Sequence, residues 1–403
     1  MRTVTRVIAA TAVAAALATA CSAPGESGDG AGGEGGSGSV TVALITSTSG
    51  PLASYGEQYL QGFEAGLDHA TGSTGEVDGI AIEVVRSDDA GEPASGVSLA
   101  RQRIDEGARI IAGTASSGVA VQMAPLAEQN EVLYITGPAA TDSVTGINDW
   151  TFRSGRQTYQ DVVTASEILA AGEGDVARDG GKVVVLAQDN AFGQANVAAV
   201  ESVLSAQGLE VGSVLVPPSA TDLTPSGAQV LGQDPDLVFV AWAGDTAQTM
   251  WTTLDQQGVL DAATVVTGLD IRATYPVFGE ARDKIALLAH YVPGATDTPE
   301  ARAMEAYFAE QGWEPDLFSP DGFTAAQMVV EAVRAGAEDA DTAAMVSALE
   351  GFSFSGVKGE QSVRESDHAL LQPMFEARFE GDLPTVVRTL DAATVAPAEP
   401  AGD

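Results

Sequence analysis

Two adjacent serines at the predicted start of a helix are the residues best suited to hold a small anion. Ser116 and Ser117 follow the apolar run 109–112 and precede a helical segment at 118–129. The first turn of a helix leaves backbone N–H groups without partners, and hydroxyls beside them complete a site for a carboxylate. Either serine can instead act only as the helix N-cap, and a single serine can do both.

Two further polar residues would complement this anion site. Thr141 lies in a turn rich in glycine and alanine after the apolar run 132–136, and it offers a hydroxyl beside main-chain groups. Asp270 follows a later run, 263–267, and offers a negative charge. A carboxylate held by one set of groups and an ammonium held by the other describe an α-amino acid. Asp270 can alternatively cap a helix or pair with Arg272.

The segments that must position these residues alternate between short apolar strands and helices. Continuous apolar strands separated by helices indicate parallel sheets that are covered on both faces. One series begins at residue 40 and a second opens with a helix at 160–171, so we expect an α/β fold with two doubly wound parallel-sheet lobes. In such sheets, ligands bind beyond the carboxyl ends of the strands. The expected strands are 40–45, 80–85, 109–112 and 132–136, then 182–187, 209–216, 237–242 and 263–267.

The rest of the chain has a different pattern. Residues 300–350 are predicted to be mostly helical, and an antiparallel hairpin is predicted at 375–388. The last dozen residues, 392–403, are mainly alanine, proline and acid, which predicts a disordered tail.

The start of the chain indicates export and a lipid anchor. Residues 17–21, Leu-Ala-Thr-Ala-Cys, resemble the lipobox of bacterial lipoproteins. We expect 1–20 to be a signal peptide, Cys21 to carry a lipid on the extracytoplasmic face of the cell membrane, and 21–39 to form a flexible Gly/Ser tether. The apolar stretch Val7–Ala20 is shorter than the roughly 20 residues of a spanning helix, which disfavours a retained anchor. Cys21 as an ordinary thiol is the remaining alternative.

Composition narrows the classes of partner. The chain has 19 Lys and Arg against 56 Asp and Glu, a formal net charge of −37. So acidic a surface repels phosphate backbones, which argues against nucleic acid as a partner. There is no Gly-x-Ser-x-Gly elbow, which disfavours a hydrolase. The three histidines, His69, His290 and His368, are scattered and Cys21 is the only cysteine, so we expect no metal and no cofactor.

Several short motifs together resemble the Leu/Ile/Val-binding proteins. These are type I periplasmic-binding proteins of branched-chain amino acid ABC transporters. The resemblance runs from about residue 40 to residue 391 and rests on the order and spacing of its motifs rather than on any one of them. The motifs are Ser49-Gly50-Pro51, Ser116-Ser117, Ala139-Ala140-Thr141, Ala191-Phe192-Gly193 and Gly268-x-Asp270.

The resemblance implies roles for the polar groups. Ser117 matches the serine that binds the ligand carboxylate. The Ala139 carbonyl and the Thr141 hydroxyl match ligands of the ammonium. Asp270 matches a position where the family commonly has glutamate, one methylene longer.

The resemblance also implies an aromatic lining. Phe192 matches an aromatic residue that packs on the ligand from the second lobe, and Tyr55 matches one near the pocket for the ligand side chain. Trp242 lies near another aromatic position. Phe192 and Trp242 can alternatively be ordinary core residues. Arg153 and Arg156 lie near the expected first crossing between lobes, where they can bridge hinge carboxylates or contact an anionic ligand.

A hinged clamp is the function that the resemblance implies. The expected first lobe comprises 40–156 and 291–352, and the second comprises 157–290 and 353–391, joined by a multi-crossover hinge. Such a lipoprotein would close on a small molecule, with a branched-chain amino acid as the expected ligand, and present it to an ABC permease in the same membrane. Amides, urea and aromatic acids are alternative ligands, and a sensor is an alternative role.

Overall fold

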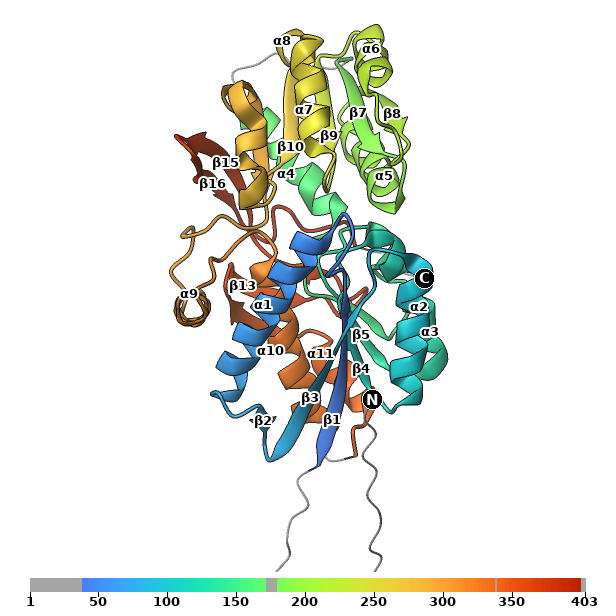
Figure 1. Ribbon diagram of the computed structural model, residues 1–403, viewed down its shortest axis with the longest axis vertical. Helices are drawn as coiled ribbons and strands as arrows, with labels where there is room; N and C mark the ends of the chain where they lie inside the picture. The colour runs from blue at the N-terminus through green and yellow to red at the C-terminus, as the bar shows by residue number, and fades with distance from the viewer. Residues whose placement is uncertain (1–37, 172–179, 338, 400–403) are drawn as a thin grey trace, which may run out of the picture. The chain divides into compact units, whose positions relative to one another are not determined.

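The first lobe is built on a six-stranded sheet in the order β2-β3-β1-β4-β5-β6 (Figure 1). The computed structural model describes residues 38–171, 180–337 and 339–399. All neighbouring strands of this sheet pair in parallel except β2, which is antiparallel to β3. The strands are β1 (Ser39–Thr46), β2 (Glu76–Val77), β3 (Ile80–Asp88), β4 (Ile110–Ala112), β5 (Leu133–Thr136) and β6 (Thr151–Arg153).

Alternation along β1 explains why both faces of this sheet are covered. Val42 and Leu44 belong to one core cluster, whereas Ala43 and Ile45 belong to another, as the two-residue period of a strand requires. Helices α1 (Ala53–Thr71), α10 (Ser319–Gly336) and α11 (Thr342–Leu349) supply the first cluster. Helices α2 (Pro93–Asp105) and α3 (Ser117–Asn130) supply the second.

The second lobe repeats this plan on a seven-stranded sheet in the order β16-β15-β11-β10-β9-β7-β8. Val184 and Leu186 of β7 face one core cluster, and Val183 and Val185 face the other. Strands β7 to β11 are parallel, and β15 and β16 form an antiparallel hairpin at one edge. The strands are β7 (Lys182–Gln188), β8 (Glu210–Val216), β9 (Leu237–Ala241), β10 (Thr264–Gly268), β11 (Ile285–Ala289), β15 (Met374–Glu380) and β16 (Leu383–Leu390).

The remaining elements complete the two lobes. The other helices are α4 (Thr158–Ala171), α5 (Ala191–Ser205), α6 (Thr224–Gly232), α7 (Ala247–Gln256), α8 (Val259–Ala262), α9 (Pro299–Gln311) and the 3₁₀ segments η1 (Asp142–Val144) and η3 (Arg272–Asp283). A small third sheet holds β12 (Ser353–Gly356), β13 (Gly359–Val363) and β14 (Leu370–Leu371). The predicted α/β architecture of two doubly wound lobes is thus confirmed.

Two expectations about the C-terminal part differ from the structure. Residues 353–371 were expected in the second lobe, but Val363 and Leu370 of the third sheet lie in the core of the first. The chain therefore makes its last crossing to the second lobe at 372–373, between β14 and β15. Within the segment expected as a disordered tail, Val395 is buried against Met374 and Leu390 of the second lobe. Cys21 and the tether to residue 37 lie outside the described residues.

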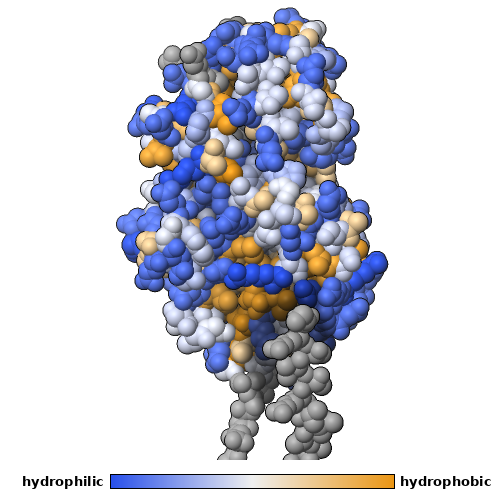
Figure 2. All heavy atoms as spheres, in the orientation of Figure 1, coloured by the Kyte–Doolittle hydropathy of each residue, from blue (hydrophilic) through white to orange (hydrophobic). Residues whose placement is uncertain are grey.

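The face shown in Figure 2 is mainly hydrophilic, with hydrophobic residues visible in limited patches. Among the described residues, no helix combines the length and the apolar character that crossing a bilayer would take.

A buried ion pair lies where the chain passes between the lobes. Lys358 Nζ is 2.9 Å from Asp321 Oδ1, and both side chains are fully buried. His290, at the second crossing, places Nε2 3.6 Å from the other Asp321 oxygen. At the first crossing, a side chain on Gly155 would meet that same oxygen at 2.8 Å. Asp321 of α10 therefore lies close to the first crossing at Gly155 and to the second at His290. It also pairs with Lys358 in the turn between β12 and β13.

Replacing Lys358 by methionine is expected to destabilise the protein by about 3–5 kcal/mol, because the Asp321 charge would remain buried without its ammonium partner. The measurement is the free energy of unfolding in urea. The matched control is Arg302→Met, which breaks an exposed ion pair with Asp297 and is expected to cost less than about 1 kcal/mol. Equal costs for the two variants would contradict this account of the buried pair.

Candidate functional site

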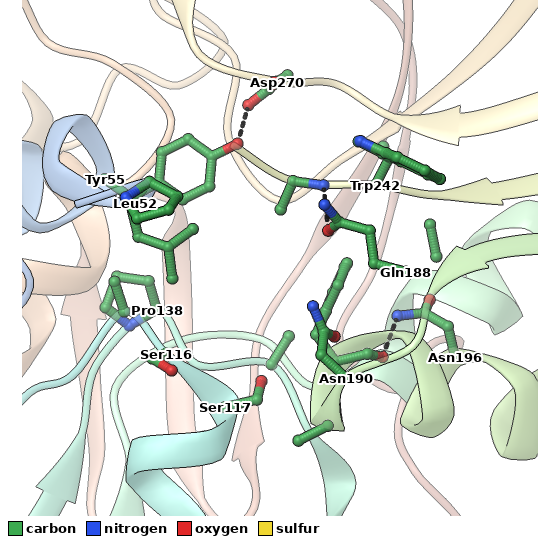
Figure 3. A pocket seen from close by; sticks show the side chains of 18 of the residues that line it. Leu52, Tyr55, Ser116, Ser117, Pro138, Gln188, Asn190, Asn196, Trp242 and Asp270 are labelled. Carbon is green, nitrogen blue, oxygen red and sulfur yellow. Dashed lines mark hydrogen bonds between the residues drawn. The ribbon is translucent and has the colours of Figure 1, made fainter. Parts of the chain in front are cut away.

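A cavity of about 670 Å³ opens between the carboxyl ends of the two sheets. This is within the usual range of roughly 300–1,000 Å³ for ligand sites. Figure 3 shows its labelled side chains, which come from both lobes. Six of the eight predicted site residues line it: Tyr55, Ser116, Ser117, Phe192, Trp242 and Asp270.

The first lobe presents the start of α3 to the cavity. Ser116 is the N-cap, because its side chain accepts a hydrogen bond from the Val119 N–H at 3.4 Å. Ser117 Oγ accepts one from the Thr141 N–H at 3.3 Å. Within the described part of the chain, the N–H groups of Ser117 and Gly118 have no hydrogen-bond partner. The capping role of Ser116 therefore leaves the next two N–H groups available as donors.

The second lobe presents aromatic and amide side chains. Phe192 is the second residue of α5, and Asn190 caps that helix by accepting from the Gly193 N–H at 2.9 Å. Trp242 follows β9 and donates its indole N–H to Thr246 Oγ1 at 2.9 Å. Phe192 and Trp242 are each partly buried against a core cluster of the second lobe while lining the cavity. Both the core interpretation and the lining interpretation therefore apply to them.

Tyr55 spans the cleft between the lobes. Its hydroxyl donates to Asp270 Oδ1 at 2.8 Å (Figure 3) and accepts from the Gly244 N–H at 3.1 Å. Its ring packs on Phe318, with ring centroids 4.6 Å apart. Burial raises the pKa of Asp270, although hydrogen bonds from Ile271 and Tyr55 oppose that effect. Asp270 is thus paired with a tyrosine of the other lobe rather than with Arg272.

Close packing of α1 on α10 places Tyr55 there. A side chain on Gly62 would lie 1.8 Å from the Ser319 carbonyl oxygen, and one on Gly322 would lie 2.0 Å from that of Tyr59. Glycine at both positions lets the helix backbones approach closely. Tyr55, in the first turn of α1, consequently meets Phe318 just before α10.

Two predicted site residues, Ala139 and Thr141, are buried and do not line the cavity. Arg153 holds both through their backbone, since Nη2 donates to the Ala139 carbonyl at 2.7 Å and Nη1 donates to the Thr141 carbonyl at 2.8 Å. The Thr141 hydroxyl accepts from the Ser143 N–H at 3.3 Å. The Arg153 side chain thus binds backbone carbonyls, not the hinge carboxylates expected for it.

Arg156 and Asp161 add a charged pair to the cavity wall. Arg156 Nε lies 3.4 Å from Asp161 Oδ2, and Arg156 Nη1 donates to the Pro138 carbonyl at 3.1 Å. Burial raises the pKa of Asp161 to about 6, against the opposing effect of the Arg156 charge. Sequence reasoning noted Arg156 but missed Asp161 and Phe318, because neither belongs to a motif at a strand end. The described residues contain no group of three or more potential ligands placed to hold a metal ion.

A family model described as periplasmic binding protein matches residues 39–382. The chain belongs to this family. Its members are solute-binding proteins that serve ABC transporters outside the cytoplasm, not enzymes, and this chain is related to their branched-chain amino acid binders. The Leu/Ile/Val-binding protein BraC3 of Rhizobium johnstonii is 25% identical over 317 residues, which cover 75% of this chain and 80% of that protein.

Solved structures share the fold of this periplasmic binding protein. An ABC-type branched-chain amino acid transporter protein from Rhodopseudomonas palustris is 30% identical, with a TM-score of 0.69 over 88% of this chain and 97% of that one. A solute-binding protein of an ABC transporter from R. palustris HaA2, in complex with p-hydroxybenzoic acid, has a TM-score of 0.79 at 23% identity, over 88% of this chain and 97% of that one.

One exposed carboxylate holds the loop that leads into α1 of this periplasmic binding protein. Asp88 Oδ1 accepts from the N–H groups of Thr48 at 2.8 Å, Ser49 at 3.2 Å and Ala90 at 2.9 Å, and Oδ2 accepts from the Ser49 hydroxyl at 2.6 Å. Partial burial alone would raise the pKa of Asp88, but these bonds outweigh it and lower the pKa to about 2. The loop continues into Pro51, which lines the cavity.

Because the folded-state pKa of Asp88 is lowered, its stabilising effect should be complete above its ordinary pKa, near 4, and should be lost as the pH falls through about 2. Asp88→Asn is expected to lower the free energy of unfolding by about 1 kcal/mol at pH 7, a small value because solvent screens this exposed group. That difference from the unmodified protein should shrink between about pH 4 and pH 2. Urea titrations across this range measure it, with Glu83→Gln on the same strand as control. A pH-independent difference would contradict the prediction.

Proposed function

We propose that this chain is a lipid-anchored extracytoplasmic component of an ABC importer that captures a small carboxylic acid between its two lobes. The observation that carries the proposal is the start of α3, where Ser117 and Gly118 line the cavity and their N–H groups have no hydrogen-bond partner among the residues that the structure describes. A helix N-terminus stabilises negative charge, and the serine hydroxyl beside it adds a donor. Ligand contacts from both lobes exist together only when the cleft is closed, so the ligand favours the closed population.

A branched-chain amino acid is one candidate ligand, in line with the Leu/Ile/Val-binding relatives. An aromatic acid is the second candidate, and the composition of the wall favours it. Five aromatic side chains line the cavity: Tyr55, Phe192, Phe239, Trp242 and Phe318. Aromatic rings stack favourably on one another at offset or tilted geometry, so such a wall suits a ligand that carries a ring.

Ser117→Ala tests the carboxylate site. The variant should bind its ligand about 10- to 100-fold more weakly, because a hydrogen bond to a charged group is worth about 1.5–3 kcal/mol. The ligand is first found by thermal-shift screening against the standard amino acids, short aliphatic acids and benzoates. Calorimetric titration then gives the affinity of each variant. The control is Ser98→Ala, an exposed serine on α2 of the same lobe. If Ser117→Ala binds the ligand as tightly as Ser98→Ala does, Ser117 is not part of the carboxylate site.

The proposed anchor is tested at Cys21. Cys21→Ser should move the protein from the membrane fraction to the soluble fraction, since a serine cannot receive the thioether-linked lipid. Fractionation of expressing cells followed by immunoblotting measures the shift. A variant that remained in the membrane fraction would contradict lipid anchoring at this residue.

A further inference from the structure

Three consecutive residues that follow β10, Asp270, Ile271 and Arg272, contact the first lobe, and we call them the docking segment. The segment belongs to the second lobe, because Leu269 before it and Tyr275 after it are buried in the core of that lobe. Ile271 is instead buried, with 4% of its surface exposed, in a cluster built mainly of first-lobe residues. An apolar side chain of one lobe is thus part of the core of the other.

Hydrogen bonds on the two sides of Ile271 run in opposite directions between the lobes. The Tyr55 hydroxyl of the first lobe donates to Asp270 Oδ1 of the second at 2.8 Å (Figure 3). The Arg272 N–H of the second lobe donates to Asp316 Oδ2 of the first at 2.9 Å. Asp316 is buried in the turn before α10. Each lobe therefore supplies one carboxylate and one donor to the contact.

The docking segment makes all these contacts with protein groups alone. Of the residues involved, Ile271, Arg272 and Asp316 do not line the cavity. Separation of the lobes would expose Ile271 to water and break both hydrogen bonds together, so the contacts favour the closed arrangement as one unit. We infer that the docking segment is a latch that holds the two lobes closed independently of the ligand.

Two consequences follow for capture of a small molecule. The closed arrangement is the main population before any ligand binds, so the ligand does not have to supply the whole free energy of closure. Entry of the ligand depends on the minor open population, which slows association. The inference concerns the closing of the clamp and holds whichever ligand the cavity takes.

Distances between spin labels, measured by double electron–electron resonance, test the latch without any ligand. A Cys21→Ser background leaves no native cysteine. One protein is labelled through Ser98→Cys on α2 and Ser202→Cys on α5, and another through Ala306→Cys on α9 and Thr252→Cys on α7; all four positions are exposed. With the docking segment intact, both pairs should give the distances of the closed lobes as the main population. Longer distances as the main population would overturn the inference.

The double variant Tyr55→Phe/Ile271→Ala releases the latch. It removes the donor to Asp270 and most of the buried apolar side chain. Each change should lower the ratio of closed to open molecules by about 10-fold or more, and the two together by about 100-fold or more. The longer distances should then be the main population.

The matched control is Tyr307→Phe/Ile147→Ala. Tyr307 packs on Trp313 of its own lobe, and Ile147 is exposed, so the closed distances should be unchanged. A shift in this control equal to that of the double variant would overturn the role of the docking segment.

Persistence of the closed distances in a Tyr55→Phe/Ile271→Ala protein that circular dichroism shows to be folded would also overturn the inference. If the double variant does not fold, Tyr55→Phe alone supplies the result, with an expected fall of about 10-fold in the ratio of closed to open molecules. An unchanged ratio in that single variant would overturn the latch. No ligand is needed, so these results are independent of the proposed ligand class.

Discussion

The hydroxyl of Tyr55 is the group on which the geometry of the cleft depends. It lies between the Gly244 N–H and the Asp270 carboxylate of the second lobe, while its own helix belongs to the first. These hydrogen bonds connect elements 189 and 215 residues apart in the chain. They form only when the lobes meet, so they bias the protein toward the closed arrangement.

The packing of α1 on α10 holds that hydroxyl in place. Glycines let α1 lie close against α10, and Tyr55 then packs on Phe318. On the other side of the cavity, Arg153 fixes the backbone after β5 through the carbonyls of Ala139 and Thr141. The same arginine that orders this turn takes up an acceptor that the family resemblance assigned to the ligand.

The sequence predicts the two lobes well because each strand is a continuous apolar run and the helices between them have a clear period. It fails for residues 353–371, since the pattern of a short antiparallel sheet does not say which lobe it packs on; Val363 and Leu370 join the first core. Tyr55 and Asp270 could both be singled out from motifs, but the bond between them could not, because no local signal relates residues 215 positions apart. The same holds for the capture of the Ala139 carbonyl by Arg153.

A crystal structure of the protein grown with the ligand that thermal-shift screening identifies would test the central claim most directly. The account predicts the ligand carboxylate within hydrogen-bond distance of the Ser117 N–H, with the Tyr55 hydroxyl still between Gly244 and Asp270. A bound ligand whose carboxylate lies away from the start of α3 would contradict it.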